Sequence, residues 1–151
     1  MIIKYMILSS FFLLKSYIIV ALNIDVHILL LMYLILIAFI DLNYKLIPNY
    51  LIGAMIIDFL VIVDLNILIS RLVIFIIIGL ILISIYYYNK EIFYGGDIKL
   101  ISTLGLYLGV GVIQVLILTG IINIIFHITF NKREIPLGPS VLLATMILWS
   151  G

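Results

Sequence analysis

The sequence predicts an all-α fold: a polytopic bundle of transmembrane helices. Of its 151 residues, 67% are hydrophobic and only 10% are charged, and the mean hydropathy is +1.47. A soluble domain of this length cannot bury so much apolar side chain, because its surface is too large for its volume. The polar residues also gather in short breaks between long apolar runs, and the cationic residues fall mainly on one side when those runs alternate in direction.

Seven spans are expected, since a spanning helix needs about 20 mostly apolar residues. The apolar region 98–130 is too long for one helix, so we expect it to break at the glycines between 105 and 111. The first run is expected to be an uncleaved helix, because no small-residue cleavage pattern follows it. The whole chain, 1–151, is expected to form one domain, with 1–22 as an additional helix and 26–151 as the core. The predicted spans lie at about 2–22, 26–40, 49–65, 72–88, 98–108, 112–130 and 137–149.

The cationic residues predict the orientation of the bundle. With the amino terminus in the cytoplasm, only Arg71 lies clearly outside, and Lys15 falls within the first span. This bias follows the positive-inside rule. The same orientation places Asp41 and Asp97 at the cytoplasmic side. The residues on or near that side are Lys4, Lys45, Lys90, Lys99, Lys132 and Arg133.

Asp41 and Asp97 are the candidate chemical groups. Asp41 opens the polar break 41–49, and Asp97 follows Gly95 and Gly96 at the start of an apolar run. A single aspartate at such a place is usually a helix cap. Ionisable groups at a membrane's edge are nevertheless costly and are functional by default. Two carboxylates that meet there can activate a water molecule against a peptide bond, which predicts an intramembrane aspartyl protease.

Three ordered motifs carry a resemblance to a known family. Asp41 precedes Ile47-Pro48-Asn49, and Asp97 lies in Gly96-Asp97-Ile98-Lys99-Leu100. A third segment, Ile135-Pro136-Leu137-Gly138-Pro139, precedes the last predicted helix. From about residue 26 to the carboxyl terminus the chain resembles the prepilin peptidases, or type IV leader peptidases, which are membrane aspartyl proteases.

This resemblance implies a site and a substrate. Asp41 and Asp97 would be the catalytic dyad, sharing one proton. No cofactor or metal is implied. The expected partner is a prepilin or pilin-like precursor, with a short basic leader that ends in glycine and precedes a hydrophobic helix. Cleavage would occur after that glycine on the cytoplasmic side of the bacterial cell membrane. The site-supporting residues would be Gly95, Gly96, Lys99, Pro48 and Asn49.

The chain departs from the family pattern in two ways. Tyr94 occupies the place of the first glycine in the family's Gly-x-Gly-Asp. Larger members also carry a soluble, cysteine-bearing insert and N-methylate the trimmed pilin. This chain has no cysteine and no room for that insert, so we expect proteolysis alone. The absence of cysteine also excludes a disulfide and a thiol nucleophile. No basic run points to a nucleic-acid partner.

Two other classes of function remain as alternatives. Asp58 lies about halfway along its predicted span, where it could serve an ion-coupled transporter. We expect it instead to hydrogen-bond within the bundle, to Asn123, Thr119 or Gln114. A non-catalytic subunit for pilus assembly is the second alternative. His27 and His127 show no metal-ligand spacing and are expected to have interface or packing roles.

Overall fold

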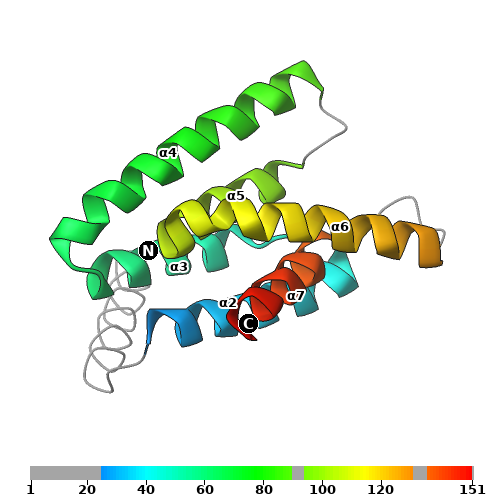
Figure 1. Cartoon of the computed structure of the whole chain (residues 1–151), viewed down its shortest axis with the longest axis horizontal. Coiled ribbons are helices and arrows are strands. Elements are labelled where there is room, and N and C mark those ends of the chain that lie inside the picture. The colour runs from blue at the N-terminus through cyan, green and yellow to red at the C-terminus, as the bar shows by residue number, and fades with distance from the viewer. Residues whose placement is uncertain (1–24, 90–93, 131–135, 151) are drawn as a thin grey trace, which may run out of the picture.

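The computed structural model describes residues 25–89, 94–130 and 136–150. The predicted first span, 2–22, lies outside these residues. All regular structure within them is helical, which confirms the all-α class. In chain order the elements are α2 (Val26–Tyr44), α3 (Asn49–Ile62), α4 (Leu65–Tyr88), α5 (Gly95–Leu108), the short 3₁₀ helix η1 (Gly109–Gly111), α6 (Val112–Phe130) and α7 (Leu137–Ser150) (Figure 1).

Successive helices alternate in direction, as Figure 1 shows. The carboxyl end of α2 and the amino ends of α3, α5 and α7 therefore meet at one end of the bundle. Helix α7 packs on α2 and α6, whereas α3 packs on α5 and α2. Helix α4 lies at the edge, mainly against α5, and Leu82 is its one buried residue.

The predicted break in the apolar region 98–130 is confirmed at η1. Gly109 has a φ of 59°, a left-handed conformation that side chains disfavour. A Cβ at this position would also lie 1.8 Å from Nη1 of Arg71. Glycine is therefore needed at the turn for the backbone angle, while the guanidinium of Arg71 occupies the space that a side chain would take.

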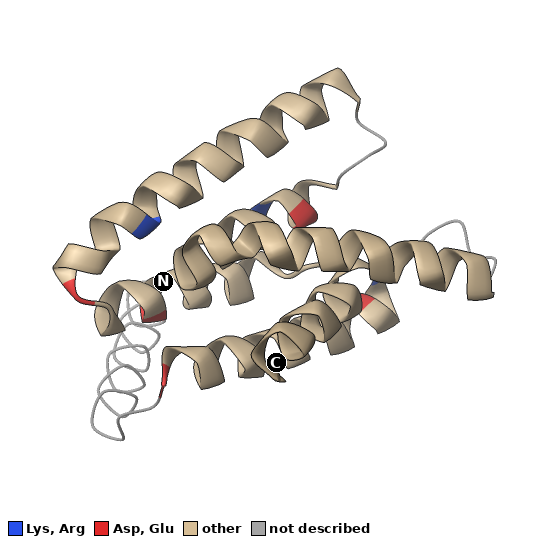
Figure 2. Cartoon of the chain, viewed as in Figure 1, with Lys and Arg blue, Asp and Glu red and all other residues tan. Residues whose placement is uncertain are grey.

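Among the residues that the structure describes, three helical segments are long and apolar enough to cross a membrane: Val26–Tyr44, Leu65–Tyr88 and the run Gly95–Thr129 that includes η1. Helices α3 and α7 are shorter, with 14 residues each. Charged residues are sparse along the described helices (Figure 2). These features identify a helical membrane protein, while the number of spans stays a prediction.

Several helix bounds differ from the predicted ones. Helix α2 continues past Asp41 to Tyr44 and ends where Lys45, at a φ of 52°, donates its backbone N–H to the Asp41 carbonyl over 2.9 Å. Helix α4 begins at Leu65, earlier than predicted, and α5 begins at Gly95. Both aspartates therefore lie within helices, in the last turn of α2 and the first turn of α5.

Candidate active site

Asp41 and Asp97 line the same cavity, of about 510 Å³, at the end of the bundle where α2, α3, α5 and α7 meet. The cavity joins the segments that carry the three sequence motifs. Of the predicted supporting residues, all but Pro48 line it. Its lining residues are Asp41, Lys45, Leu46, Ile47, Asn49, Tyr94, Gly95, Gly96, Asp97, Lys99, Pro136 and Leu137.

The backbone of α7 holds the Asp41 carboxylate. The Gly138 N–H donates a hydrogen bond of 2.7 Å to Oδ2 of Asp41, which is only 5% exposed. This donor lies in the first turn of α7, where the helix dipole favours a negative charge. A Cβ on Gly138 would lie 3.1 Å from that Oδ2 and 3.2 Å from the Ala38 Cα. The missing side chain thus allows α7 to approach α2 closely enough for this bond.

Asp97 is held by the start of its own helix. Its Oδ2 accepts a hydrogen bond of 3.1 Å from the Tyr94 backbone N–H, an arrangement that satisfies a donor at the helix terminus. Next to it, a Cβ on Gly96 would lie 3.2 Å from the Ile47 Cβ. Gly96 therefore lets the start of α5 lie against the segment that precedes α3, so the two aspartate-bearing motifs touch.

Lys99 and Asn49 connect the same two helices. The Lys99 Nζ donates a hydrogen bond of 2.9 Å to Oδ1 of Asn49. Lys99 was predicted to support the site, and this contact gives it a bridging role between α5 and α3. Pro48 does not line the cavity. It precedes α3 as its N-cap, and its carbonyl accepts the Leu51 N–H over 3.1 Å.

The contact between Gly138 and Asp41 was missed by the sequence analysis. The segment 135–139 was noted as a motif, but nothing assigned Gly138 to a carboxylate on another helix. A glycine directly before a proline in the first turn of an apolar helix was the available signal. Glycine there costs helix stability and so indicates a close approach.

Asp58 lies elsewhere, within the bundle. It is 1% exposed and accepts a hydrogen bond from the Tyr33 hydroxyl of α2. The expected packing role is supported, but the hydrogen-bond partner is Tyr33 and not one of the expected Asn123, Thr119 or Gln114. The Asn123 side chain accepts a hydrogen bond from Ser140, and the Thr119 hydroxyl has no hydrogen-bond partner among the described residues. Polar groups at this depth need partners on neighbouring helices, and the aromatic hydroxyl of Tyr33 provides one.

No three His, Asp or Glu side chains among residues 25–89, 94–130 and 136–150 lie close enough to hold a metal ion. His27 packs edge-to-face on Trp149, with ring centroids 4.8 Å apart. This contact agrees with the packing role expected for His27.

A comparison with known protein families finds a match over most of the chain. The sequence profile of the "Type IV leader peptidase family" matches residues 28–129. This range includes both aspartates and ends before the third motif, at 135–139. No curated protein and no solved structure matches the chain.

Proposed function

Because the chain belongs to the type IV leader peptidase family and is therefore a peptidase, we propose that it is a membrane aspartyl endopeptidase with Asp41 and Asp97 as its catalytic dyad. One observation carries the proposal. Two aspartates from distant segments line one cavity, and a backbone N–H holds Oδ2 of each. In this proposal Oδ1 of each carboxylate contacts the attacking water molecule or the substrate.

The reaction needs one proton on the pair. Two carboxylates close together share a proton, because ionising both is costly. The ionised carboxylate takes a proton from water, and the water oxygen bonds to the scissile carbonyl carbon while the protonated carboxyl donates to the carbonyl oxygen. The intermediate then collapses: the C–N bond breaks, and the leaving nitrogen receives a proton. The pair titrates as a unit, so acid and base are not assigned to individual residues.

The proposed substrate is a pilin-like precursor, cut after the glycine that ends its basic leader on the cytoplasmic side. The family supports this substrate class. The position of the cavity at the end of the bundle, where four helix termini meet, is also suitable for a peptide that enters from water.

The test is cleavage of such a precursor by the full chain in proteoliposomes. Asp41→Asn and Asp97→Asn preserve side-chain size but remove the acid–base function. We expect each to lower the rate at least about a thousandfold, as in other sites whose general acid–base group is lost. Asp64→Asn, at an exposed aspartate outside the cavity, is the matched control and should cleave at the wild-type rate. Wild-type cleavage by both site variants would refute the proposal.

The same assay distinguishes the alternatives. Asp58 does not line the cavity that contains Asp41 and Asp97. If Asp58→Asn abolished function while Asp41→Asn and Asp97→Asn did not, an ion-coupled transporter would be indicated. A non-catalytic assembly subunit would be indicated if the wild-type protein bound the precursor without cleaving it.

A further inference from the structure

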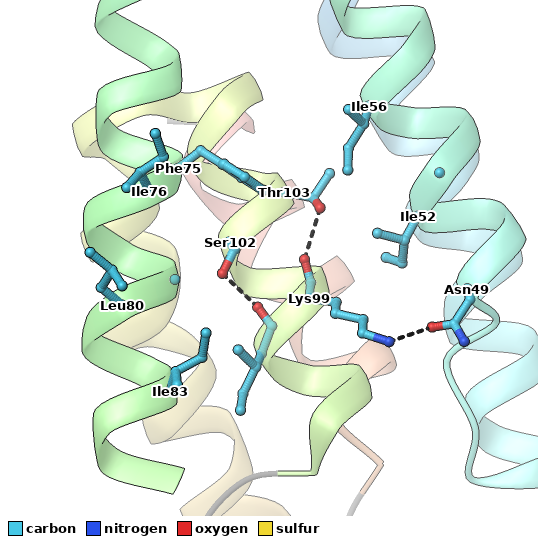
Figure 3. Close-up of a pocket in the computed structure, with 13 residues that line it drawn as sticks. Asn49, Ile52, Ile56, Phe75, Ile76, Leu80, Ile83, Lys99, Ser102 and Thr103 are labelled. Atoms are coloured by element: carbon cyan, nitrogen blue, oxygen red, sulfur yellow. Dashed lines mark hydrogen bonds between the residues drawn. The ribbon is translucent and has the colours of Figure 1, made fainter. Parts of the chain in front are cut away.

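We propose that the apolar groove between α3 and α4 binds the hydrophobic helix of the precursor, in the part that directly follows the scissile bond. The inference rests on the proposed function and extends it to how the substrate is positioned. The groove encloses about 520 Å³. Figure 3 shows side chains of α4 and α3 facing each other across this space, with α5 between them.

The groove offers apolar contacts almost exclusively. The hydroxyls of Ser102 and Thr103 face it, but each donates to a carbonyl of its own helix, Ile98 over 2.7 Å and Lys99 over 2.8 Å. The lone charged side chain among its lining residues, Lys99, is bonded to Asn49. A polar ligand would therefore find few hydrogen-bond partners in the groove, whereas an apolar ligand would lose no hydrogen bonds by entering it.

A small residue on the α3 wall leaves room in the groove for a helix. Gly53 of α3 lines it, and a Cβ there would meet no atom within 4 Å. Gly79 of α4 also lines the groove, but a Cβ there would lie 3.4 Å from the Ser102 Oγ, so this glycine lets α4 pack closely on α5 beside the groove. Helices in lipid associate through close packing rather than through a hydrophobic driving force, and small residues permit the close approach.

The extent of the groove matches a piece of helix. Its lining runs from Asn49 to Ile56 on α3 and from Phe75 to Ile83 on α4. At 1.5 Å per residue these stretches are about 11–12 Å long, or about two helical turns.

Continuity with the cavity of the two aspartates favours the substrate helix over a lipid chain. Asn49 and Lys99 line both spaces, so the groove ends where that cavity begins. In the proposed substrate the hydrophobic helix starts directly after the cleavage site. A helix seated in the groove would therefore begin at Asn49 and Lys99 and deliver the preceding peptide bond to Asp41 and Asp97. A lipid acyl chain would require no such junction.

Cysteine cross-linking tests the contact directly, because the chain contains no cysteine of its own. Leu80→Cys places a thiol in the groove, and Ile81→Cys is the matched control on the same helix, since the native side chains are 60% and 54% exposed and Ile81 does not line the groove. The probe is a precursor with one cysteine in the first two turns of its hydrophobic helix. We expect disulfide formation at least about fivefold higher with Leu80→Cys. Equal yields would overturn the inference.

Filling the groove provides the kinetic test. Gly53→Leu adds bulk where a Cβ meets no atom, and Gly120→Leu adds the same bulk on the exposed face of α6, outside the groove. Leucine favours the helix at both sites, so folding should persist. We expect Gly53→Leu to raise KM for the precursor about tenfold with kcat nearly unchanged, because it removes binding and not chemistry. Gly120→Leu should leave both constants unchanged.

Different results would overturn the groove inference and the proposed function. Equal KM values for the two leucine variants, with cleavage still dependent on Asp41 and Asp97, would overturn the groove inference alone and leave a lipid chain as its occupant. Cleavage independent of Asp41 and Asp97 would refute the proposed function, whatever the leucine variants show.

Discussion

At Gly138 a hydrogen atom occupies a position where any other residue would place carbon 3.1 Å from Oδ2 of Asp41. The same atom would lie 3.2 Å from the Ala38 Cα, which is backbone and cannot rotate away. The contact between α7 and the carboxylate therefore depends on this glycine. Since α7 also donates its Gly138 N–H to Asp41, any shift of the helix changes the position of the catalytic candidate.

We predict that Gly138→Ala lowers the rate of precursor cleavage about tenfold with the protein still folded, because a displacement of a few tenths of an ångström disturbs a reacting group. Gly120→Ala is the control, as a Cβ there meets no atom within 4 Å. Initial rates per folded enzyme in proteoliposomes measure the effect. Equal rates for the two alanine variants would show that the close approach at Gly138 is unimportant.

At the scale of single residues, the sequence predicted which side chains are candidate catalytic groups but not which groups they contact. The polar breaks around Asp41 and Asp97 predicted candidate acids at one side of the membrane, and the structure brings the two residues to one cavity. The Gly138 N–H that holds Asp41 was not foreseen, whereas the Tyr94 N–H bond to Asp97 is the helix-cap contact that is usual for an aspartate at such a place. The glycine before a proline at 138 indicated a close approach, but a backbone N–H can donate to many groups, so its partner Asp41 emerges only from packing.

Among the elements, helix α3 accepts hydrogen bonds from tyrosine hydroxyls of two neighbouring helices. Tyr33 of α2 donates to Asp58, and Tyr107 of α5 donates to the Met55 carbonyl over 2.7 Å. The rings of Phe59 and Tyr107 also pack with centroids 5.0 Å apart. Buried polar contacts of this kind fix how neighbouring helices face one another, because each group is costly when it loses its partner.

Tyr33→Phe removes the donor to Asp58 while keeping the ring. We predict a loss of about 1–3 kcal/mol in unfolding free energy, the cost of a buried acceptor that loses a hydrogen bond. Tyr50→Phe, at an exposed tyrosine, is the control and should change stability little. Reversible denaturation in mixed micelles provides the measurement. If Tyr33→Phe is as stable as Tyr50→Phe, the bond does not stabilise the bundle.

The elements themselves were largely predictable. Apolar runs bounded by polar breaks predicted α2 to α7, and the glycine cluster predicted the turn between α5 and α6. The predicted ends of the helices were less accurate. Helix α4 begins at Leu65 instead of about residue 72, because polar residues such as Asn66 and Arg71 are tolerated within its first turns. The Tyr33 partner of Asp58 depends on the rotation of α2 about its axis, which α2's nearly uniform apolar sequence does not specify.

For the whole molecule, the alternation of helices predicts the topology in the membrane. Tyr44 and Asp64 are exposed and flank α3 at its two ends. In single-cysteine variants of the cysteine-free chain, we expect Tyr44→Cys to react with an impermeant maleimide only from the cytoplasmic side, and Asp64→Cys only from the outside. Labelling in intact spheroplasts and inverted vesicles measures this. Reaction of both from the same side would contradict the proposed orientation.

The shortness of α3 and α7 has a consequence for the bilayer. At 14 residues each they are about 21 Å long, against a hydrocarbon thickness of about 30 Å, and both start at the cavity of Asp41 and Asp97. Because of this hydrophobic mismatch, the bilayer would be thinner around the cavity, or the cavity would lie below the level of the headgroups. We therefore expect turnover to decline in phosphatidylcholines of increasing acyl-chain length, measured at fixed enzyme and precursor density. A rate indifferent to chain length would mean that the surrounding helices relieve the mismatch, whereas a declining rate would make membrane thickness a regulator of proteolysis.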